Sequence, residues 1–231
     1  MALVGLNKDE LDLSRLPADA HYDPKDDTDD LSGVQIRATI TFKITDANGT
    51  VIKEWTEPAH SLNYNFGLFM DALWGSTTVS MTNTAGNGIS VNGASGGTLA
   101  VTAASGNTAY GIVIGSGASA GSTPSPTLYN LVAQIPQGTS SGQIEYGAVS
   151  VSSVSQSGQT TSFTISRSFT NVSGATLSVT EIGLVTLIAG WNMGAYSGGT
   201  YTLIAYDIPS SAISVQNGQT LTITYTFSVS T

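Results

Sequence analysis

A serine between small residues is the first candidate for chemistry in this sequence. Residues 117–121 read Gly-Ala-Ser-Ala-Gly, the spacing at which a sharp strand-to-helix turn exposes a serine nucleophile beside a base. Both histidines, His21 and His60, precede Ser119, whereas that arrangement places its histidine last in the chain. The Ser-Thr-Pro-Ser-Pro-Thr run that follows does not open a helix. We therefore expect a linker-like loop over residues 115–127 and no hydrolase activity from Ser119.

Two further patterns of catalytic type lack the partners that they need. Gly115 and Gly117 with Ala120 imitate a dinucleotide fingerprint, but neither the following helix nor the acidic residue about 20 positions on is present. Glycoside hydrolysis requires two carboxylates on either side of the bond. Nothing in the spacing of the acids within the sheet-forming region specifies such a pair; these acids are Asp71, Glu145, Glu181 and Asp207. We interpret them as hydrogen-bonded structural residues and predict that the protein is not an enzyme.

Metal binding has few candidate ligands. The chain has no Cys and only 2 His, which excludes thiolate zinc sites, iron–sulfur clusters, disulfides and a three-histidine zinc site. We interpret His60, just before the expected helix, as a capping or packing residue. The acidic run Asp23, Asp26, Asp27, Asp29 and Asp30 could hold Ca²⁺ through its oxygens. It lacks the alternate acids, central glycine and final glutamate of an EF-hand loop, so we interpret it as a solvated arm and leave Ca²⁺ open as the one cofactor.

The charges are concentrated near the start of the chain. The 231 residues have a formal net charge of −9 and only 10% are charged; residues 1–57 hold twelve acids and six bases, and the other 174 residues hold five charges. An acidic chain lacks the positive field that attracts phosphate backbones, so we expect no nucleic-acid partner. No segment reaches the roughly 18 continuous apolar residues of a membrane span. The opening residues 1–6 have no basic flank, so no secretory leader is expected.

Alternation of apolar and polar residues predicts a β-rich body over residues 34–231. From 34 to 44 every second residue is apolar, the Asp-Ala-Asn-Gly turn at 46–49 follows, and 50–55 returns as the hairpin partner. Apolar residues three and four apart predict one helix over 61–74, capped by Ser61. Further short strands are expected at 77–82, 89–92, 98–103, 110–114, 128–135, 144–154, 160–170, 176–188, 200–206 and 220–229. The predicted fold class is all-β: an antiparallel β-sandwich of jelly-roll type with one short helix and an extended N-terminal arm.

The arm, residues 1–33, combines aliphatic side chains with dense charge. The aliphatic residues are too few to fold alone, yet a purely solvating acidic tail has no reason to carry them. We therefore predict that the arm is an assembly element that packs on a neighbouring copy. Its candidate contact residues are Leu3, Val4, Leu6, Leu11, Leu13 and Leu16.

The C-terminal third carries a recurring pattern. A strand ending Phe-Thr-Asn-x-Ser-Gly is followed by Val-x-Glu-x-Gly-Leu, a return strand and a closing Val-x-x-Gly-Gln-Thr-Leu-x-Ile-Thr-Tyr segment. The matching positions are 169–171, 173, 174, 179, 181, 183, 184, 215 and 218–225. This pattern resembles virion structural proteins of tailed phages and archaeal viruses, over about 65 residues well and over 34–74 loosely. The resemblance implies a capsid, turret, decoration or tail role and carries over no catalytic residues.

The functional hypothesis is therefore a non-enzymatic structural protein of a virus particle. It would assemble through β-sheet edges and its arm, with copies of itself and other virion proteins as partners, and reach the virion by assembly in the host cytoplasm. That route explains a missing leader. Two alternatives remain: a filament or adhesin subunit that docks a strand or arm into its neighbour, and a carbohydrate-binding module or hydrolase built on a β-sandwich. A row of exposed aromatic residues on one sheet face would favour the last.

Overall fold

The computed structural model describes residues 35–59, 62–75, 77–93, 98–190 and 199–230. The chain divides into two units, Met1–Gly33 and Val34–Thr231. The first unit, with the predicted contact residues of the arm and its acidic run, lies outside the described residues. The account that follows concerns the second unit.

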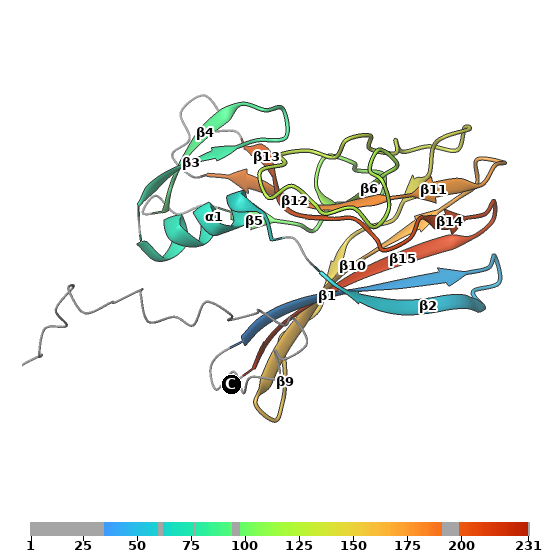
Figure 1. Cartoon of the computed structure of the whole chain (residues 1–231), viewed down its shortest axis with the longest axis horizontal. Helices are drawn as coiled ribbons and strands as arrows, with labels where there is room; N and C mark the ends of the chain where they lie inside the picture. The colour runs from blue at the N-terminus through green and yellow to red at the C-terminus, as the bar shows by residue number, and fades with distance from the viewer. Residues whose placement is uncertain (1–34, 60–61, 76, 94–97, 191–198, 231) are drawn as a thin grey trace, which may run out of the picture. The chain divides into compact units, whose positions relative to one another are not determined.

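The larger sheet has seven antiparallel strands and joins the first described strand to the last (Figure 1). Its order is β2 (Val51–Pro58), β1 (Gln35–Thr45), β15 (Thr220–Ser230), β10 (Thr160–Thr170) and β7 (Glu145–Tyr146), with β8 (Ser150–Val151) and β9 (Ser155–Ser157) also paired to β10. β1 pairs with β15, and β15 with β10, over eleven residues each. The long strands β1, β15 and β10 therefore form the centre of this sheet.

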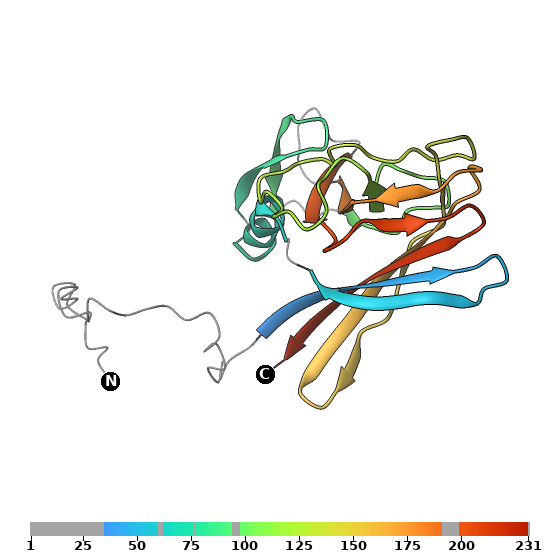
Figure 2. The ribbon, with the colours of Figure 1, turned by 45° about the vertical axis from the view of Figure 1, so that its right-hand side comes forward.

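A second sheet packs against the core face of the first (Figure 2). It consists of β13 (Thr200–Asp207), β12 (Glu181–Ala189), β6 (Gly111–Gly115) and β5 (Thr98–Ala100). Two smaller antiparallel pairs accompany it: β11 (Leu177–Val179) with β14 (Ile213–Val215), and β3 (Thr78–Thr82) with β4 (Gly88–Asn92). The architecture is sandwich-like and predominantly antiparallel β, which confirms the fold class at that level.

The core follows directly from the alternation in β1 and β15. Ile40, Phe42 and Ile44 point inward from β1, and their cross-strand partners on β15 are also buried apolar side chains. Across the core lie the apolar residues of β6 and β12, which are buried on both faces. Burial on both faces requires a further layer outside the second sheet, and the loop between β6 and β7 supplies it, with Leu131 and Ile135 in the core cluster.

The single described helix, α1 (Tyr64–Gly75), begins later than the periodicity predicts. Its N-cap is Asn63, whose Oδ1 accepts the N–H of Phe66 at 3.2 Å, instead of Ser61, which lies outside the described residues. Asn63 Nδ2 also donates to the carbonyls of Leu128 and Leu203. Asparagine can cap the helix and bind these carbonyls at the same time, because its amide has a separate acceptor and donor. A serine hydroxyl also accepts and donates, but its side chain is shorter.

Several predicted strands differ from the structure. The segment 128–135 is not a strand: two of its N–H groups bind a side chain instead of a neighbouring strand, and only an isolated bridge joins Gln134 to Gly115. The region 144–154 is broken into β7 and β8, and 176–188 is interrupted at Thr180, where β11 ends and β12 begins. The short strands β9 and β14 are missed altogether. Alternation identifies long strands, whereas β9 and β14 have three residues each and are too short to show it.

The exposure gradient along β1 yields a stability prediction. Ile40 is 2% exposed and Ile36 is 66% exposed, although both lie on the same face of the same strand. Ile40→Ala should lower the free energy of unfolding by about 2–5 kcal/mol, because it leaves a cavity in the core. Ile36→Ala, the matched control, should change it by less than about 0.5 kcal/mol. Urea denaturation measures both, and equal losses would contradict the placement of the core.

Candidate functional site

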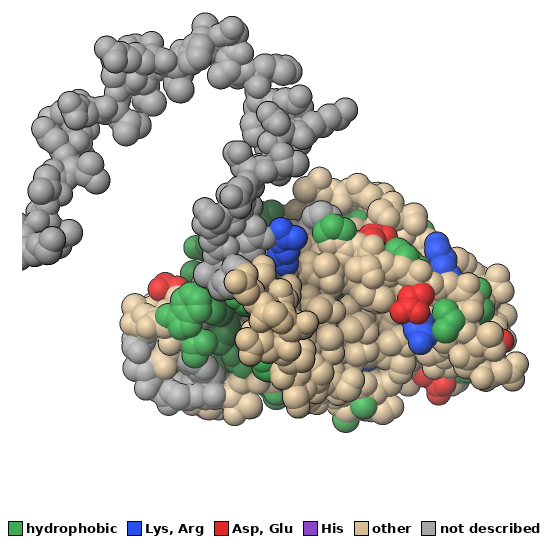
Figure 3. Space-filling view, turned by 90° about the horizontal axis from the view of Figure 1, so that it is seen from below, with side chains coloured by type: hydrophobic (Ala, Val, Ile, Leu, Met, Phe, Trp, Pro, Cys, Tyr) green, Lys and Arg blue, Asp and Glu red, His purple; other side chains and the backbone are tan. Residues whose placement is uncertain are grey.

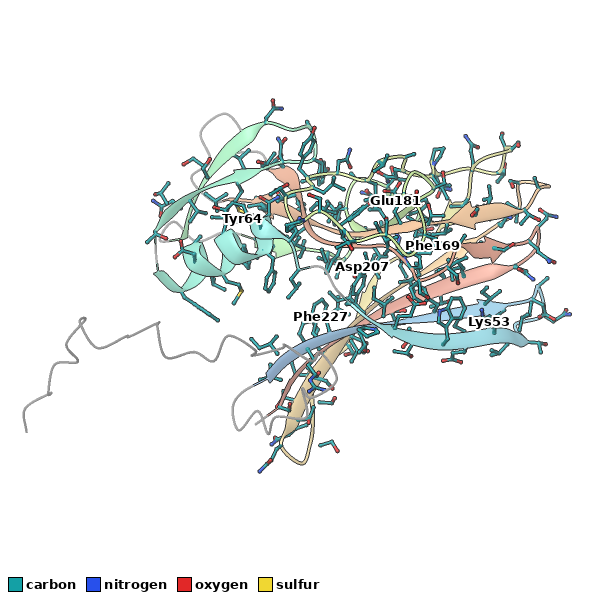
Figure 4. All side chains as sticks on the ribbon, viewed as in Figure 1. Lys53, Tyr64, Phe169, Glu181, Asp207 and Phe227 are labelled. Atoms are coloured by element: carbon teal, nitrogen blue, oxygen red, sulfur yellow. The ribbon has the colours of Figure 1, made fainter. Side chains whose placement is uncertain are left out.

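The carboxylate of Glu181, at the start of β12, is a buried charge that accepts four hydrogen bonds (Figure 4). Its Oε1 accepts the N–H groups of Gly117 at 2.9 Å and Ala133 at 2.7 Å. Its Oε2 accepts the N–H of Val132 at 2.8 Å and the hydroxyl of Tyr206 at 2.8 Å. Glu181 is fully buried, and these four donors replace the water that its charge would otherwise require.

This coordination fixes the loop over residues 116–134 to the second sheet. Gly115 and Gly117 are required at its base, because a Cβ at Gly115 would lie 2.4 Å from Glu181 Oε1 and one at Gly117 would lie 2.7 Å from the N atom of Ala133. The carboxylate therefore closes the outer layer of the core. Glu181 is saturated by protein donors and does not face solvent, so it serves as an anchor in this geometry.

Arg167, on β10, is a second buried charge that holds backbone. Its Nε donates to the carbonyl of Gly147 at 2.8 Å, and its Nη1 donates to that of Ile112 at 2.8 Å. Further bonds run to the carbonyls of Tyr110, Ala104 and Asn107. The guanidinium lies 4.8 Å from the ring centroid of Tyr146. Burial lowers the pKa of Arg167 to about 10. Five carbonyls from three chain segments thus converge on one side chain.

Asp207 and Tyr225 form a buried pair between the two sheets. The hydroxyl of Tyr225 donates to Asp207 Oδ2 at 2.7 Å. Burial and the neighbouring Asp207 raise the pKa of Tyr225 well above its usual value. Burial and the hydrogen bond to Glu181 also raise the pKa of Tyr206 above its usual value. Both tyrosines therefore remain protonated donors to carboxylates.

Asn171 organises the turn that carries the Phe-Thr-Asn-x-Ser-Gly pattern. Its side chain donates to the carbonyls of Ala175 and Val215 and accepts the N–H and hydroxyl of Ser173. Gly174 follows at φ 79, a conformation that favours glycine, and its N–H donates to Asn217 Oδ1. The loop after β10 is thereby joined to the loop before β15. Asn171 and Glu181, which both belong to the pattern, therefore hold backbone groups in this chain.

The structure does not bring the predicted catalytic candidates together. Ser119 is exposed in a loop with no helix after it. Glu181 and Asp207 are buried and hydrogen-bonded, as the interpretation of sheet-borne acids expects. Asp71 is exposed on α1, and Glu145 is half-buried on β7. Both histidines lie outside the described residues. Asn171 belongs to the pattern at 169–171, although no hydrogen-bonding role was expected of it. Arg167 was not singled out from the sequence, although a lone basic residue among apolar strand positions is a usable signal.

A shallow groove of about 690 Å³ lies at the end of β2. Glu57, Ile208, Ser210 and the loop segment 121–124 line it. Glu57 accepts the N–H of Ser210 at 3.0 Å and its hydroxyl at 2.6 Å. These bonds join β2 to the loop after β13. Within the described residues, no group of three or more metal-binding side chains occurs here or elsewhere.

Apolar side chains are exposed on α1 and at one end of the larger sheet. In α1 only Asn65 and Ala72 are buried, and Trp74 is 75% exposed; hydrophobic side chains gather at this end of the face in Figure 3. In the sheet, exposed Ile36 and Val229 pair across β1 and β15. Surfaces of this kind are typical of contacts with other macromolecules.

Comparisons with protein-family models, curated proteins and solved structures give no match for this chain. Among the described residues, no helix has the length and apolar character to cross a bilayer. Inference about function therefore depends on the residues and their geometry.

Replacing the central anchor tests its role. In Glu181→Gln, one carboxylate oxygen becomes an NH₂ group that faces backbone N–H donors. At least one N–H then loses its acceptor, at a cost of about 1–3 kcal/mol in the free energy of unfolding. Amide hydrogen exchange over 116–134 should also accelerate. Glu145→Gln, at a half-buried edge, is the control and should change neither measurement appreciably.

The buried tyrosines predict a loss of stability at alkaline pH. Burial raises the pKa of Tyr146 to about 12, and the pKa values of Tyr206 and Tyr225 also lie above the ordinary 10.0. Above pH 10 the unfolded chain releases these protons and the folded chain keeps them, so the free energy of unfolding falls as pH rises. Arg167 contributes to this pH dependence with the opposite sign, because burial lowers its pKa in the folded protein. The three tyrosines outnumber it, so the net free energy of unfolding still falls.

Urea midpoints between pH 8 and 11, with tyrosinate absorbance recorded in parallel, check this expectation. Three of the nine tyrosines should ionise only as the protein unfolds. A midpoint that stays constant through pH 11, with all nine tyrosines ionising in the folded protein, would contradict it.

Proposed function

We propose that this chain is a non-enzymatic structural protein of a virus particle, in a capsid, turret, decoration or tail position. Its partners are copies of itself and other virion proteins, and it enters the virion by assembly in the host cytoplasm. The observation that carries the proposal is the distribution of side chains. The buried charges of Glu181 and Arg167 hold backbone, while large apolar side chains remain exposed on α1 and at the sheet end.

A particle component must stay folded without chaperones, and this chain has no cysteine for a disulfide. Glu181, Arg167 and Asn171 supply non-covalent substitutes, because each ties loops from distant parts of the sequence to the sheets. The sparsely charged, Ser- and Thr-rich surface is also suited to a wide range of pH. These features support an exposed structural role.

We further propose that the sandwich is of jelly-roll type. The pairing of β1 with β15 and of β15 with β10 places early, middle and late strands side by side in one sheet, and β12 with β13 forms a hairpin in the other. Chain crossings of this kind between two sheets are typical of jelly rolls.

The alternative functions receive less support. Exposed large aromatic residues in the described part of the chain are Tyr64 and Trp74 on α1 and Tyr129 in a loop, so they do not form the row on a sheet face expected of a carbohydrate-binding module. A filament or adhesin subunit would share the assembly mode. Electron microscopy of the assembled product distinguishes a closed shell, ring or spike from an open filament.

The arm provides the test. Burying its six aliphatic side chains on a neighbour contributes about 1.5–3 kcal/mol each, against about 1–2 kcal/mol for each residue ordered. Many cooperating copies, or added contacts to the acidic run, are therefore needed. Deletion of residues 2–30 should leave a folded β-rich body that no longer assembles. Circular dichroism checks the fold and sedimentation velocity checks the assembly. Normal assembly of the truncated chain would contradict the proposal.

A second pair of variants separates the arm's apolar and acidic contributions. One replaces the six aliphatic residues 3, 4, 6, 11, 13 and 16 with Ser, and the other replaces the aspartates of 23–30 with Asn. The first should abolish assembly, and the second should leave it in place. The reverse result would assign the contact to charge and count against the predicted apolar arm.

A further inference from the structure

Strand β2 presents a backbone edge that can accept another strand. β2 ends the order of the seven-stranded sheet, and β1 is its strand partner within the described residues. Figures 1 and 2 both show β2 along the margin of the sheet. Open edges with unpaired N–H and C=O groups are templates for pairing with a second chain.

The hydrogen-bond pattern shows which groups point outward. The N–H of Ala59 donates to the carbonyl of Ala38 at 2.9 Å, so antiparallel alternation directs the N–H groups of residues 57, 55 and 53 toward β1. The N–H and C=O groups of Glu54 and Thr56 then face away from β1. Pro58 lies at the next outward position, where its missing N–H removes nothing from the pairing with β1.

The side chains beside this edge form an ordered row. Lys53, Trp55 and Glu57 share the core-side face of β2, since their partners on β1 are the buried Ile44, Phe42 and Ile40. Lys53 Nζ lies 4.3 Å from the Trp55 ring centroid, and Trp55 Nε1 donates to Glu57 Oε1 at 3.0 Å. The Trp55 ring packs on Phe42 at 5.0 Å. The row thus runs positive, aromatic, negative, and Figure 4 shows Lys53 on β2.

We propose that β2 pairs antiparallel with β2 of a second copy, about a two-fold axis that passes through Trp55. Glu54 of each copy lies opposite Thr56 of the other and exchanges backbone hydrogen bonds with it, four in all. Lys53 of each copy lies opposite Glu57 of the other, which makes two ion pairs, and the two Trp55 rings meet at the centre. Cross-strand aromatic and opposite-charge pairs each stabilise such a junction.

Two of the neighbouring two-fold registers bring like charges together. An axis through Glu54 places two Glu54 carboxylates opposite each other, and an axis through Lys53 does the same with two ammonium groups. Like charges directly opposite destabilise a strand pair. The register shift between Ile44 and Thr45 interrupts β2 near residue 52, and Pro58 limits it at the other end. The junction is therefore short and closes on itself as a dimer instead of propagating as a fibre.

This inference rests on the proposed function, because it specifies one of the self-contacts through which the protein assembles. The two can nevertheless fail separately. The arm deletion tests assembly beyond the dimer and leaves β2 intact, whereas the variants below change only β2. A wild-type chain that stays monomeric at all concentrations would overturn both. If the arm deletion abolishes all assembly while the β2 variants associate as the wild type does, only the pairing is overturned.

The charge-swap experiment uses the full chain and sedimentation velocity. Lys53→Glu places like charges across the junction and should raise the dimer dissociation constant at least about tenfold; Glu57→Lys should do the same. Mixing the two variants restores both opposite-charge pairs, so the heterodimer should form near wild-type affinity. Arg37→Glu, an equal charge change at an exposed position of β1 that pairs with β15 and not with β2, is the control and should alter the constant less than about twofold. Failure of the mixture to recover association overturns the register.

Removing an outward donor tests the backbone contact independently. Thr56→Pro deletes two of the four inter-copy hydrogen bonds, since the Thr56 N–H does not bind β1, and should weaken the dimer at least about tenfold. As a monomer, Thr56→Pro should have the same thermal midpoint and circular dichroism spectrum as Lys53→Glu. This agreement would show that β2 remains folded in the variant. A Thr56→Pro chain that is folded and dimerises as the wild type does overturns the proposal.

Discussion

The outer layer of this sandwich depends on one buried carboxylate. The second sheet is apolar on both faces, so something must cover its outside, and the covering segment is a loop without a strand partner for much of its backbone. Glu181 solves this problem by accepting three N–H groups from that loop and a fourth bond from Tyr206. A loop can therefore act as a layer of the fold because a charge beneath it takes the place of a neighbouring strand.

The same arrangement recurs with opposite polarity in Arg167, which gathers carbonyls where Glu181 gathers N–H groups. Together with Asn171 these side chains join segments of irregular backbone to regular strands. A chain with 10% charged residues thus places some of its few charges where burial makes each hydrogen bond stronger. The surface is correspondingly poor in charge, which is why its exposed apolar residues and its open strand edge stand out as contact features.

Long elements were predictable from the sequence, and the partners of the polar anchors were not. Alternation in β1, β10 and β15 locates those strands within one or two residues, because each is longer than the local irregularities and has one face in the core. The segment 128–135 is also rich in apolar residues but is held by a side chain about 50 positions away. No local pattern records such a partner. The isolated acids and the single basic residue among apolar strands mark where anchors could exist, without naming what they bind.

The pairing of β1 with β15 has a consequence for how the chain acquires its structure. Thr45 and Thr220 are cross-strand partners although 175 positions separate them, and β15 is also the strand that joins β1 to β10. The middle of the larger sheet therefore stays open until almost the whole body has been synthesised. Contacts between such distant positions slow folding, since a long loop must close before the interactions form. During that interval β1 and β10 each present an unpaired edge that another chain could bind. Insertion of β15 between them pairs both edges and ends this risk of misassembly.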